Sequence, residues 1–292
     1  MYVYVNGEIV RKEEARISPF DHGFMYGLGA FETFRTYNGH PFLLDDHLER
    51  LNDSLVDMNI DLVLHRDEVM AVLRQLLQAN ELKDVYVRLN VSAGVGDIGL
   101  QTDSYTAPVV IVYMKPLPSV ASSEKVCAIL KTKRNSPEGK KRLKSHHYLN
   151  NVLGKREIGN DPRMEGIFLN EQGFVTEGIV SNIFWVKNGI VYTPSLETGA
   201  LNGITRQFVL ALFTALQICY EEGLYRLHEL ETADEVFLTN SIQEIVPVVR
   251  IHDRCYLGKE GPVTKRLKKY YERFAAHLWT RHELIERIDQ QW

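Results

Sequence analysis

A segment near residue 120, rich in proline and serine, is the feature that most limits how this chain of 292 residues can fold. Between Lys115 and Ser123 there are two prolines and three serines, and the apolar residues follow no regular period. This composition is typical of a linker between compact regions. We therefore predict an N-terminal domain at 1–118, a linker at 119–123 and a C-terminal domain at 124–292.

Strand-like and helix-like stretches both occur before the linker. Residues 2–5 alternate in polarity, and the pair Asn6-Gly7 predicts a hairpin turn into a second strand at 8–11. Glycines at 23, 27 and 29 interrupt a run of aromatic residues, which indicates that the backbone passes close to another group there. Apolar spacing predicts further strands at 31–37, 85–92 and 109–114, and helices at 43–58 and 66–77.

The second half of the chain also contains both strand-like and helix-like stretches. Strands are predicted at 125–130, 166–169, 180–186, 190–192, 234–238 and 245–249. Helices are predicted from the residues after Lys144 to about Gly159, from about Gly203 to Ala215, and as one long element at 263–288. No internal repeat is present, so the fold class is expected to be α+β, with two mixed α/β domains.

The composition is that of an ordinary globular protein, with 45% hydrophobic and 25% charged residues. The formal net charge is -4 and there is no long basic run, which argues against nucleic acid or an anionic membrane as the main partner. No apolar run is long enough to span a bilayer, and the N-terminus lacks the apolar core of a signal peptide. Three widely spaced cysteines predict reduced thiols, so we expect a cytoplasmic protein.

Lys144 is the first candidate for chemistry, because it stands where an extended segment is expected to turn into a helix. A lysine held in a pocket there can lose hydration, and its lowered pKa then makes the amine a nucleophile. The alternative is a solvated surface charge, since Lys140, Lys141 and Arg142 precede it. The adjacent histidines, His146 and His147, lack the spacing of a zinc site, and we predict no metal there.

A lysine amine is most versatile when it forms a Schiff base with the aldehyde of pyridoxal phosphate. Such a site needs an acidic partner for the pyridine nitrogen, and Glu177 is the candidate because it lies in an apolar stretch where a carboxylate requires a cation. The alternative for Glu177 is an exposed turn.

The phosphate of such a cofactor would need an anion site. Asn202 and Gly203 look like a capped helix start, whose Ile204 and Thr205 amides could bind phosphate. Asn240 and Ser241 follow an apolar strand, and Arg50 offers a planar guanidinium. Each of these also has a plain structural reading: a capped helix, a turn and an exposed helix charge.

The order of these motifs is more specific than any one of them. The chain reads FDHGFMYGLGAFE, DDHLERL, KSHHYLNNVLGKRE, TEGIVSN, GITR and TNSIQEI in succession. This series resembles the class IV aminotransferase family, the fold-type IV pyridoxal phosphate enzymes, over nearly the whole chain. The resemblance implies two α+β domains with the cofactor in the cleft between them, a homodimer and a small-molecule substrate.

The resemblance also implies a role for each candidate. Lys144 becomes the Schiff-base lysine, and Glu177 becomes the partner of the pyridine nitrogen. The remaining cofactor-binding residues would hold the phosphate: Arg50, Ile204, Thr205, Asn240 and Ser241.

Within the family, the phrases around Lys144 most resemble the aminodeoxychorismate lyases. The loop AGVGDIGL lacks the arginine and histidine that trap the substrate carboxylate in D-amino acid aminotransferases. The branched-chain enzymes carry Gly-Gly-Asn-Tyr after the lysine, whereas this chain carries Ser-His-His-Tyr there. The expected activity is therefore the lyase. The alternatives are an aminotransferase acting on D- or branched-chain amino acids with 2-oxoglutarate, and a non-catalytic anion-binding protein. Candidate groups for the substrate carboxylates are Tyr26, Thr33, Arg35 and Arg88.

Overall fold

The computed structural model describes residues 1–117 and 124–289, and the chain divides into two compact units. Unit 1 comprises Met1–Pro118, Leu143–His147 and Ala276–Thr280, and unit 2 comprises Ser119–Arg142, Tyr148–Ala275 and Arg281–Trp292. The linker predicted at 119–123 lies outside the described residues, so that boundary stays a prediction. Unit 1 thus includes one short segment from the middle of the sequence and one from near its end.

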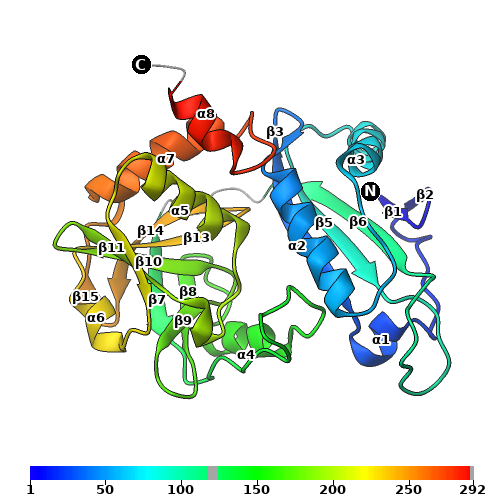
Figure 1. The fold of residues 1–292 in the computed structure, drawn as a ribbon, viewed down its shortest axis with the longest axis horizontal. Helices are drawn as coiled ribbons and strands as arrows, with labels where there is room; N and C mark the ends of the chain where they lie inside the picture. Colours follow the sequence, from blue (N-terminus) through cyan, green and yellow to red (C-terminus); the bar gives the residue numbers. More distant parts are fainter. Residues whose placement is uncertain (118–123, 290–292) are drawn as a thin grey trace. The chain divides into compact units, whose positions relative to one another are not determined.

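Unit 1 is built on a six-stranded antiparallel sheet in the order β2-β1-β6-β5-β3-β4 (Figure 1). Its strands are β1 (Tyr2–Val5), β2 (Glu8–Arg11), β3 (Gly29–Tyr37), β4 (His40–Pro41), β5 (Val85–Ser92) and β6 (Val109–Pro116). Its helices are α1 (His22–Tyr26), α2 (Leu44–Asp57) and α3 (Arg66–Asn80). The predicted hairpin, strands and two longer helices are confirmed, whereas α1 and β4 were not predicted.

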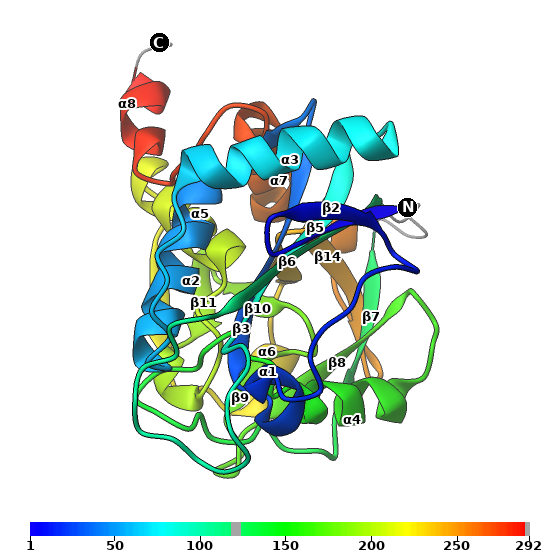
Figure 2. The same cartoon turned by 90° about the vertical axis from the view of Figure 1, so that its right-hand side faces the viewer.

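Alternation along the strands gives this sheet two different faces. Ala30 and Phe34 of β3 share a core with Val87 and Val91 of β5 and with Leu48 of α2. Helices α2 and α3, which Figure 2 draws beside these strands, supply the apolar layer on this side. The intervening residues of β3 and β5 therefore point to the opposite face, because side chains in a strand alternate with a period of two.

Unit 2 contains a nine-stranded mixed sheet in the order β12-β11-β10-β13-β14-β7-β8-β9, with β15 paired to β14. Its strands are β7 (Lys125–Ile129), β8 (Met164–Leu169), β9 (Val175–Gly178), β10 (Asn182–Lys187), β11 (Ile190–Pro194), β12 (Tyr220–Gly223), β13 (Glu235–Asn240), β14 (Glu244–Ile251) and β15 (Arg254–Cys255). Its helices are α4 (Leu149–Ile158), α5 (Ile204–Ala215), α6 (Leu227–Glu231), α7 (Pro262–Phe274) and α8 (Glu283–Asp289). Most strands here were predicted, whereas β12, β15 and α6 were not.

The single helix predicted at 263–288 is wrong, because the chain leaves helical geometry after α7 and resumes it at α8. The carbonyl oxygens of Leu278 and Trp279 accept hydrogen bonds from the amides of Leu43 and Asp45, at 3.1 and 3.0 Å. Leu43, the N-cap of α2, has left-handed backbone angles and no side-chain cap. The carbonyls of 278 and 279 thus satisfy amides at the start of α2 that have no partner inside that helix.

Helix α4 begins where it was predicted, but its apolar residues face outward. Asn151 and Gly154 are its buried residues, whereas Leu149 is 67% exposed and Val152 and Leu153 about 40%.

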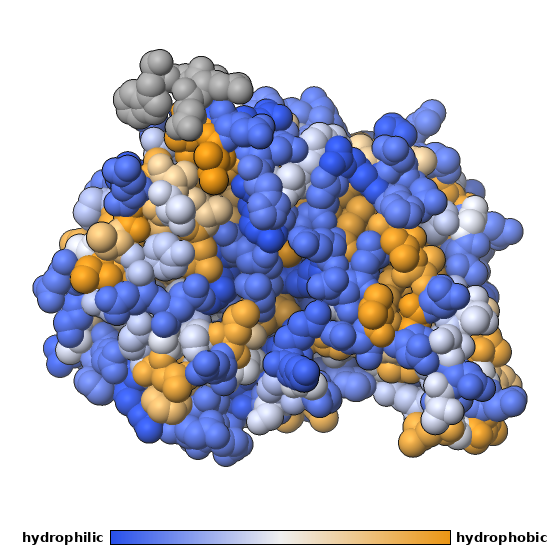
Figure 3. All heavy atoms as spheres, in the orientation of Figure 1, coloured by the Kyte–Doolittle hydropathy of each residue, from blue (hydrophilic) through white to orange (hydrophobic). Residues whose placement is uncertain are grey.

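The face drawn in Figure 3 is mostly hydrophilic, with hydrophobic residues gathered in separate patches. Among the described residues, no helix has both the length and the apolar character needed to cross a membrane.

Candidate active site

Lys144 belongs to unit 1, where its backbone is paired with the start of β3. The amide of Phe31 donates to the carbonyl of Lys144 at 2.9 Å, and the amide of His146 donates to the carbonyl of Gly29 at 2.9 Å. This antiparallel bridge, centred on Ala30 and Ser145, fixes the main chain on both sides of the lysine. Its Nζ lies 4.6 Å from the centre of the Phe31 ring.

Three of the four predicted substrate residues share the sheet face on which Lys144 packs. Thr33 is directly paired with Arg88, and Phe31 is paired with Asn90. Arg35, two residues after Thr33, therefore lies on the same face. We call the six-stranded sheet of unit 1 sheet 1, and this surface its polar face, the polar face of sheet 1. It brings a lysine and two arginines to one side of two neighbouring strands.

Tyr26 lies apart from this face, in α1. Its hydroxyl accepts a hydrogen bond from the Gly99 amide at 2.8 Å, so it supports the loop after β5. Its carbonyl oxygen is 3.4 Å from Nε2 of His147. Tyr26 therefore contacts the segment after Lys144 through its own main-chain carbonyl and not through its side chain.

The side chains of His146 and Arg88 meet at Asn90. Nε2 of His146 lies 3.0 Å from Oδ1 of Asn90, and the Arg88 guanidinium stacks 3.6 Å from the centre of the Phe31 ring. Burial, with a further contribution from the Arg88 charge, lowers the pKa of His146 to about 4. The imidazole is therefore neutral at physiological pH.

Arg50 is held on the other side of sheet 1 by two residues that the sequence reasoning missed. Its Nε and Nη2 donate to the two carboxylate oxygens of Glu32 at 2.7 Å each, and Nδ1 of His47 lies 2.6 Å from Oε2. Burial raises the pKa of Glu32, but the Arg50 charge and the hydrogen bonds outweigh burial, and the pKa falls to about 2. Burial lowers the pKa of His47, and its Nδ1 must donate to Glu32 because an ionised carboxylate only accepts.

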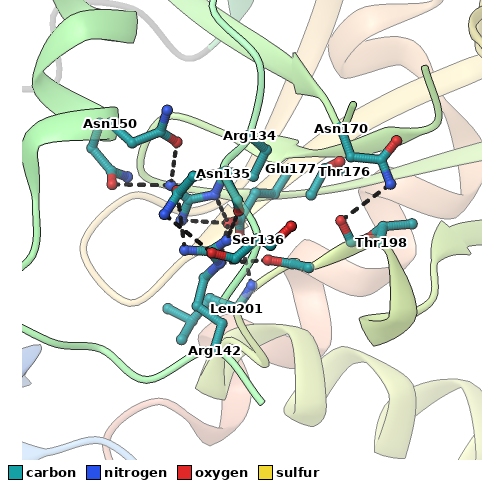
Figure 4. Close-up of polar contacts among 12 residues, drawn as sticks. Arg134, Asn135, Ser136, Arg142, Asn150, Asn170, Thr176, Glu177, Thr198 and Leu201 are labelled. Atoms are coloured by element: carbon teal, nitrogen blue, oxygen red, sulfur yellow. Dashed lines mark hydrogen bonds and ion pairs between the residues drawn. The ribbon is translucent and has the colours of Figure 1, made fainter. Parts of the chain in front are cut away.

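In unit 2, Glu177 is buried but already has a cationic partner. Nε and Nη2 of Arg134 both lie 2.8 Å from Oε1 of Glu177. The amide of Leu201 donates to Oε2 at 3.0 Å, and the Arg142 guanidinium lies 4.0 Å from Oε1. Figure 4 shows both arginines beside the carboxylate. Glu177 is therefore buried and paired with a cation, as expected, but the cation in the structure is Arg134 and not a pyridinium.

Arg134 also connects this carboxylate to the first turn of α4. Its Nη1 donates to Oδ1 of Asn150 at 2.8 Å and to Oδ1 of Asn151 at 3.2 Å. Arg142 is bonded to the carbonyls of Gly199 and Asn135, which fixes the chain two residues before Lys144. Burial, with a contribution from the Arg134 charge, lowers the pKa of Arg142 to about 10.

The start of α5 differs from the expected capped helix. Its N-cap is Gly203 and not Asn202, and no side chain caps it. Asn202 instead accepts from Nη1 of Arg206 at 3.2 Å. A side chain at Gly203 would overlap Oδ1 of Asn182, so only glycine fits. The amides of Ile204 and Thr205 consequently face outward along the helix axis without an intrahelical acceptor.

The second part of the predicted anion site lies beside this helix start. The hydroxyl oxygens of Thr205 and Ser241 are 3.4 Å apart. Oδ1 of Asn240 accepts from the amides of Ile242 and Gln243 at 3.0 and 2.7 Å, so its side chain shapes the turn that carries Ser241. Unit 2 thus brings together four of the predicted phosphate-binding residues, while Arg50 is described with unit 1.

Residues 29–251 match the sequence model of the family described as amino-transferase class IV. The chain belongs to the class IV aminotransferase family. It is 47% identical to the aminodeoxychorismate lyase of Bacillus subtilis (strain 168), over 93% of this chain and 94% of that protein.

Solved structures of class IV aminotransferase relatives share the fold. The 4-amino-4-deoxychorismate lyase of Pseudomonas aeruginosa superposes with a TM-score of 0.80 at 28% identity, covering 94% of this chain and 99% of that one. The branched-chain aminotransferase of the thermophilic archaeon Thermoproteus uzoniensis, solved with norvaline, gives a TM-score of 0.83 at 30% identity, covering 94% of this chain and 95% of that one. The predicted fold class is confirmed.

This member of the class IV aminotransferase family contains buried polar residues that no local motif revealed. Glu32 could have been noticed as a lone carboxylate inside an apolar strand, which requires a partner when buried. Arg134 had no comparable signal, because it is one of many loop arginines until the fold places it 2.8 Å from Glu177. Among the described residues, no cluster of histidine, cysteine, aspartate or glutamate is arranged to hold a metal ion.

Proposed function

We propose that this protein is an aminodeoxychorismate lyase, which converts 4-amino-4-deoxychorismate to 4-aminobenzoate and pyruvate with pyridoxal phosphate as cofactor. The observation that carries the proposal is the polar face of sheet 1, where Lys144 lies with Arg35 and Arg88. A substrate with two carboxylates suits a face with two arginines. The identity to the Bacillus subtilis lyase supports the same reading.

The donor set fits the proposed cofactor. Thr205 and Ser241 stand at an uncapped helix start, where backbone amides and the helix dipole favour a phosphate group. Glu177 is a buried carboxylate that could face a protonated pyridine nitrogen. Arg50 would add a guanidinium that Glu32 already orients. Lys144 would supply the amine that joins the aldehyde.

When bound, pyridoxal phosphate supplies an aldehyde that condenses with amines and a ring that accepts electrons from the adjacent carbon. Lys144 acts as the base that removes the proton from the amine-bearing ring carbon of the substrate. It then donates a proton to the departing enolpyruvyl group, which leaves as pyruvate when the ether C–O bond breaks. The substrate ring becomes aromatic, and no oxidant, reductant or second substrate is required.

The other groups hold the substrate and keep charges in place. Arg88 and Arg35 bind the carboxylates, with Thr33 between them as a hydrogen-bonding group. Tyr26 would line the approach from α1. Arg134 keeps the Glu177 carboxylate fixed against the turn at Leu201, so that its position does not change during the reaction.

The test is an assay of purified protein with 4-amino-4-deoxychorismate, in which 4-aminobenzoate is detected by its fluorescence after chromatography. We expect product with the wild-type protein and a loss of at least about 1,000-fold in Lys144→Ala. Lys140→Ala, four residues earlier in the same loop and exposed, is the matched control. A wild-type protein that binds the cofactor but forms no 4-aminobenzoate contradicts the lyase.

An aminotransferase is the second candidate, favoured by the 39% identity to a putative branched-chain-amino-acid aminotransferase of Methanocaldococcus jannaschii. Incubation with D- or branched-chain amino acids and 2-oxoglutarate, with glutamate as the measured product, separates the two activities. Glutamate formation without 4-aminobenzoate formation would establish the aminotransferase.

We also propose a cytoplasmic homodimer. The exposed apolar side chains of α4, Leu149, Val152 and Leu153, support self-association, because such a surface is stabilised when a second apolar surface covers it. The free thiols Cys127, Cys219 and Cys255 agree with a reducing compartment. Sedimentation of the purified protein tests the dimer.

A further inference from the structure

His146 and His147, the second and third residues after Lys144, fit against Gly29, the first residue of β3, and Gly27, the C-cap of α1. A Cβ on Gly29 would overlap the ring of His146, and a Cβ on Gly27, which has a φ of +71°, would lie 2.8 Å from Cδ2 of His147. The glycines that interrupt the aromatic run therefore leave space for these rings. His146 is partly buried, whereas His147 is exposed.

The hydrogen bonds around Asn90 fix which nitrogen of His146 carries its proton. Nε and Nη2 of Arg88 lie 3.4 and 3.3 Å from Oδ1 of Asn90. Arginine has only donors, so Asn90 must present its oxygen to Arg88. The same oxygen lies 3.0 Å from Nε2 of His146, which must therefore donate as N–H. A neutral imidazole protonated at Nε2 satisfies this arrangement.

The shared oxygen restrains the guanidinium of Arg88. The guanidinium plane stacks on Phe31, 3.6 Å from the ring centre, and Asn90 accepts from one edge of it. Lys144 contacts the same Phe31 ring from 4.6 Å. An arginine restrained by stacking and by an edge hydrogen bond loses less conformational freedom when it binds a carboxylate.

We propose that His146 is a positioning residue for substrate binding: through Asn90 it holds Arg88 flat on Phe31, and so sets the affinity of the protein for a carboxylate ligand beside Lys144. The inference rests on the proposed function only in assigning carboxylate binding to Arg88. His146 itself does not touch the reacting atoms in this scheme. Its effect must therefore pass through Arg88.

A double-mutant cycle on the cofactor-loaded protein tests this dependence. His146→Phe keeps a ring over Gly29 and removes the N–H donor, whereas His146→Gln places an N–H donor at a similar distance from the backbone. The dissociation constants of 4-aminobenzoate and of 2-oxoglutarate are measured from the change in cofactor absorbance. Unfolding temperature and cofactor content are recorded for every variant.

We expect His146→Phe to weaken carboxylate binding about tenfold, as for the loss of one hydrogen bond to a charged network, with His146→Gln closer to wild type. Arg88→Gln should weaken binding at least as much, and adding His146→Phe to it should cause no further loss. Asn90→Ala should weaken binding as much as His146→Phe, since it removes the shared acceptor. It replaces His146→Phe in the cycle if that variant does not fold.

Equal losses from His146→Phe in the wild-type and Arg88→Gln proteins would overturn the inference, because His146 would then act independently of Arg88. Unchanged affinity in both His146→Phe and Asn90→Ala would overturn it as well. A wild-type protein that binds 2-oxoglutarate and not 4-aminobenzoate would contradict the proposed lyase alone, since the cycle can be completed with 2-oxoglutarate. Binding of neither ligand would overturn both.

Discussion

Replacing Glu32 with glutamine should remove a part of the acid sensitivity of unit 1. The pKa of Glu32 is lowered from 4.5 to about 2 in the folded protein, and one pKa unit corresponds to about 1.4 kcal/mol, so its ionisation contributes about 3 kcal/mol. A carboxylate with a lowered folded pKa takes up its proton first in the unfolded chain. Its contribution is therefore complete above about pH 4.5 and is lost as the pH falls toward 2.

The assay is urea unfolding followed by tryptophan fluorescence at several pH values between 7 and 3. Near pH 7, Glu32→Gln should lower the free energy of unfolding by about 3–5 kcal/mol, because Arg50 is left without its buried counter-ion. By pH 3 the difference between the wild type and Glu32→Gln should shrink by about 2 kcal/mol.

Glu8→Gln, an exposed carboxylate on β2, is the control for this experiment and should stay within about 0.5 kcal/mol of wild type. A difference between wild type and Glu32→Gln that remains constant from pH 7 to pH 3 would refute the reasoning. Glu32 would then not be the ionised partner of Arg50.

Three further predictions follow from unit 2. Arg134→Met should cost about 3–5 kcal/mol in urea unfolding, and adding Glu177→Gln should restore part of that loss, because the buried charge is then removed. Gly203→Ala should weaken pyridoxal phosphate binding at least about tenfold by absorbance titration, since its Cβ overlaps Asn182 at the start of α5. Gly139→Ala is the matched control, because a Cβ there meets nothing within 4 Å and neither glycine has a positive φ. Leu153→Glu should shift the sedimenting species from dimer toward monomer without changing the far-UV circular dichroism.

Local patterns predicted the secondary structure where alternation and tertiary packing agree. The strand at 85–92 was placed correctly because its core-facing valines and leucine recur every second residue. The helix at 263–288 was wrong because its carbonyls bond to residues more than 230 positions earlier in the chain. No periodic pattern contains that information.

The candidate site shows the same limit. Local sequence and motif order made Lys144, Glu177, Thr205 and Ser241 candidates, but the buried contacts of the site join residues that are distant in the sequence. Arg134 is separated from Glu177 by 43 positions, and Arg50 from Glu32 by 18. Helix α4 shows a related limit: apolar spacing predicted the helix but not its orientation, and the fold buries Asn151 and Gly154 instead of its leucines and valine.

The assignment of Leu143–His147 and Ala276–Thr280 to unit 1 has a consequence for biosynthesis. The first part of the chain leaves the ribosome without the segment that pairs with β3 and without the carbonyls that bond to the start of α2. Unit 1 is therefore expected to stay incomplete until nearly the whole polypeptide has been made. A truncated chain ending near residue 118 should accordingly leave the amides of Phe31, Leu43 and Asp45 without their acceptors and need chaperone protection.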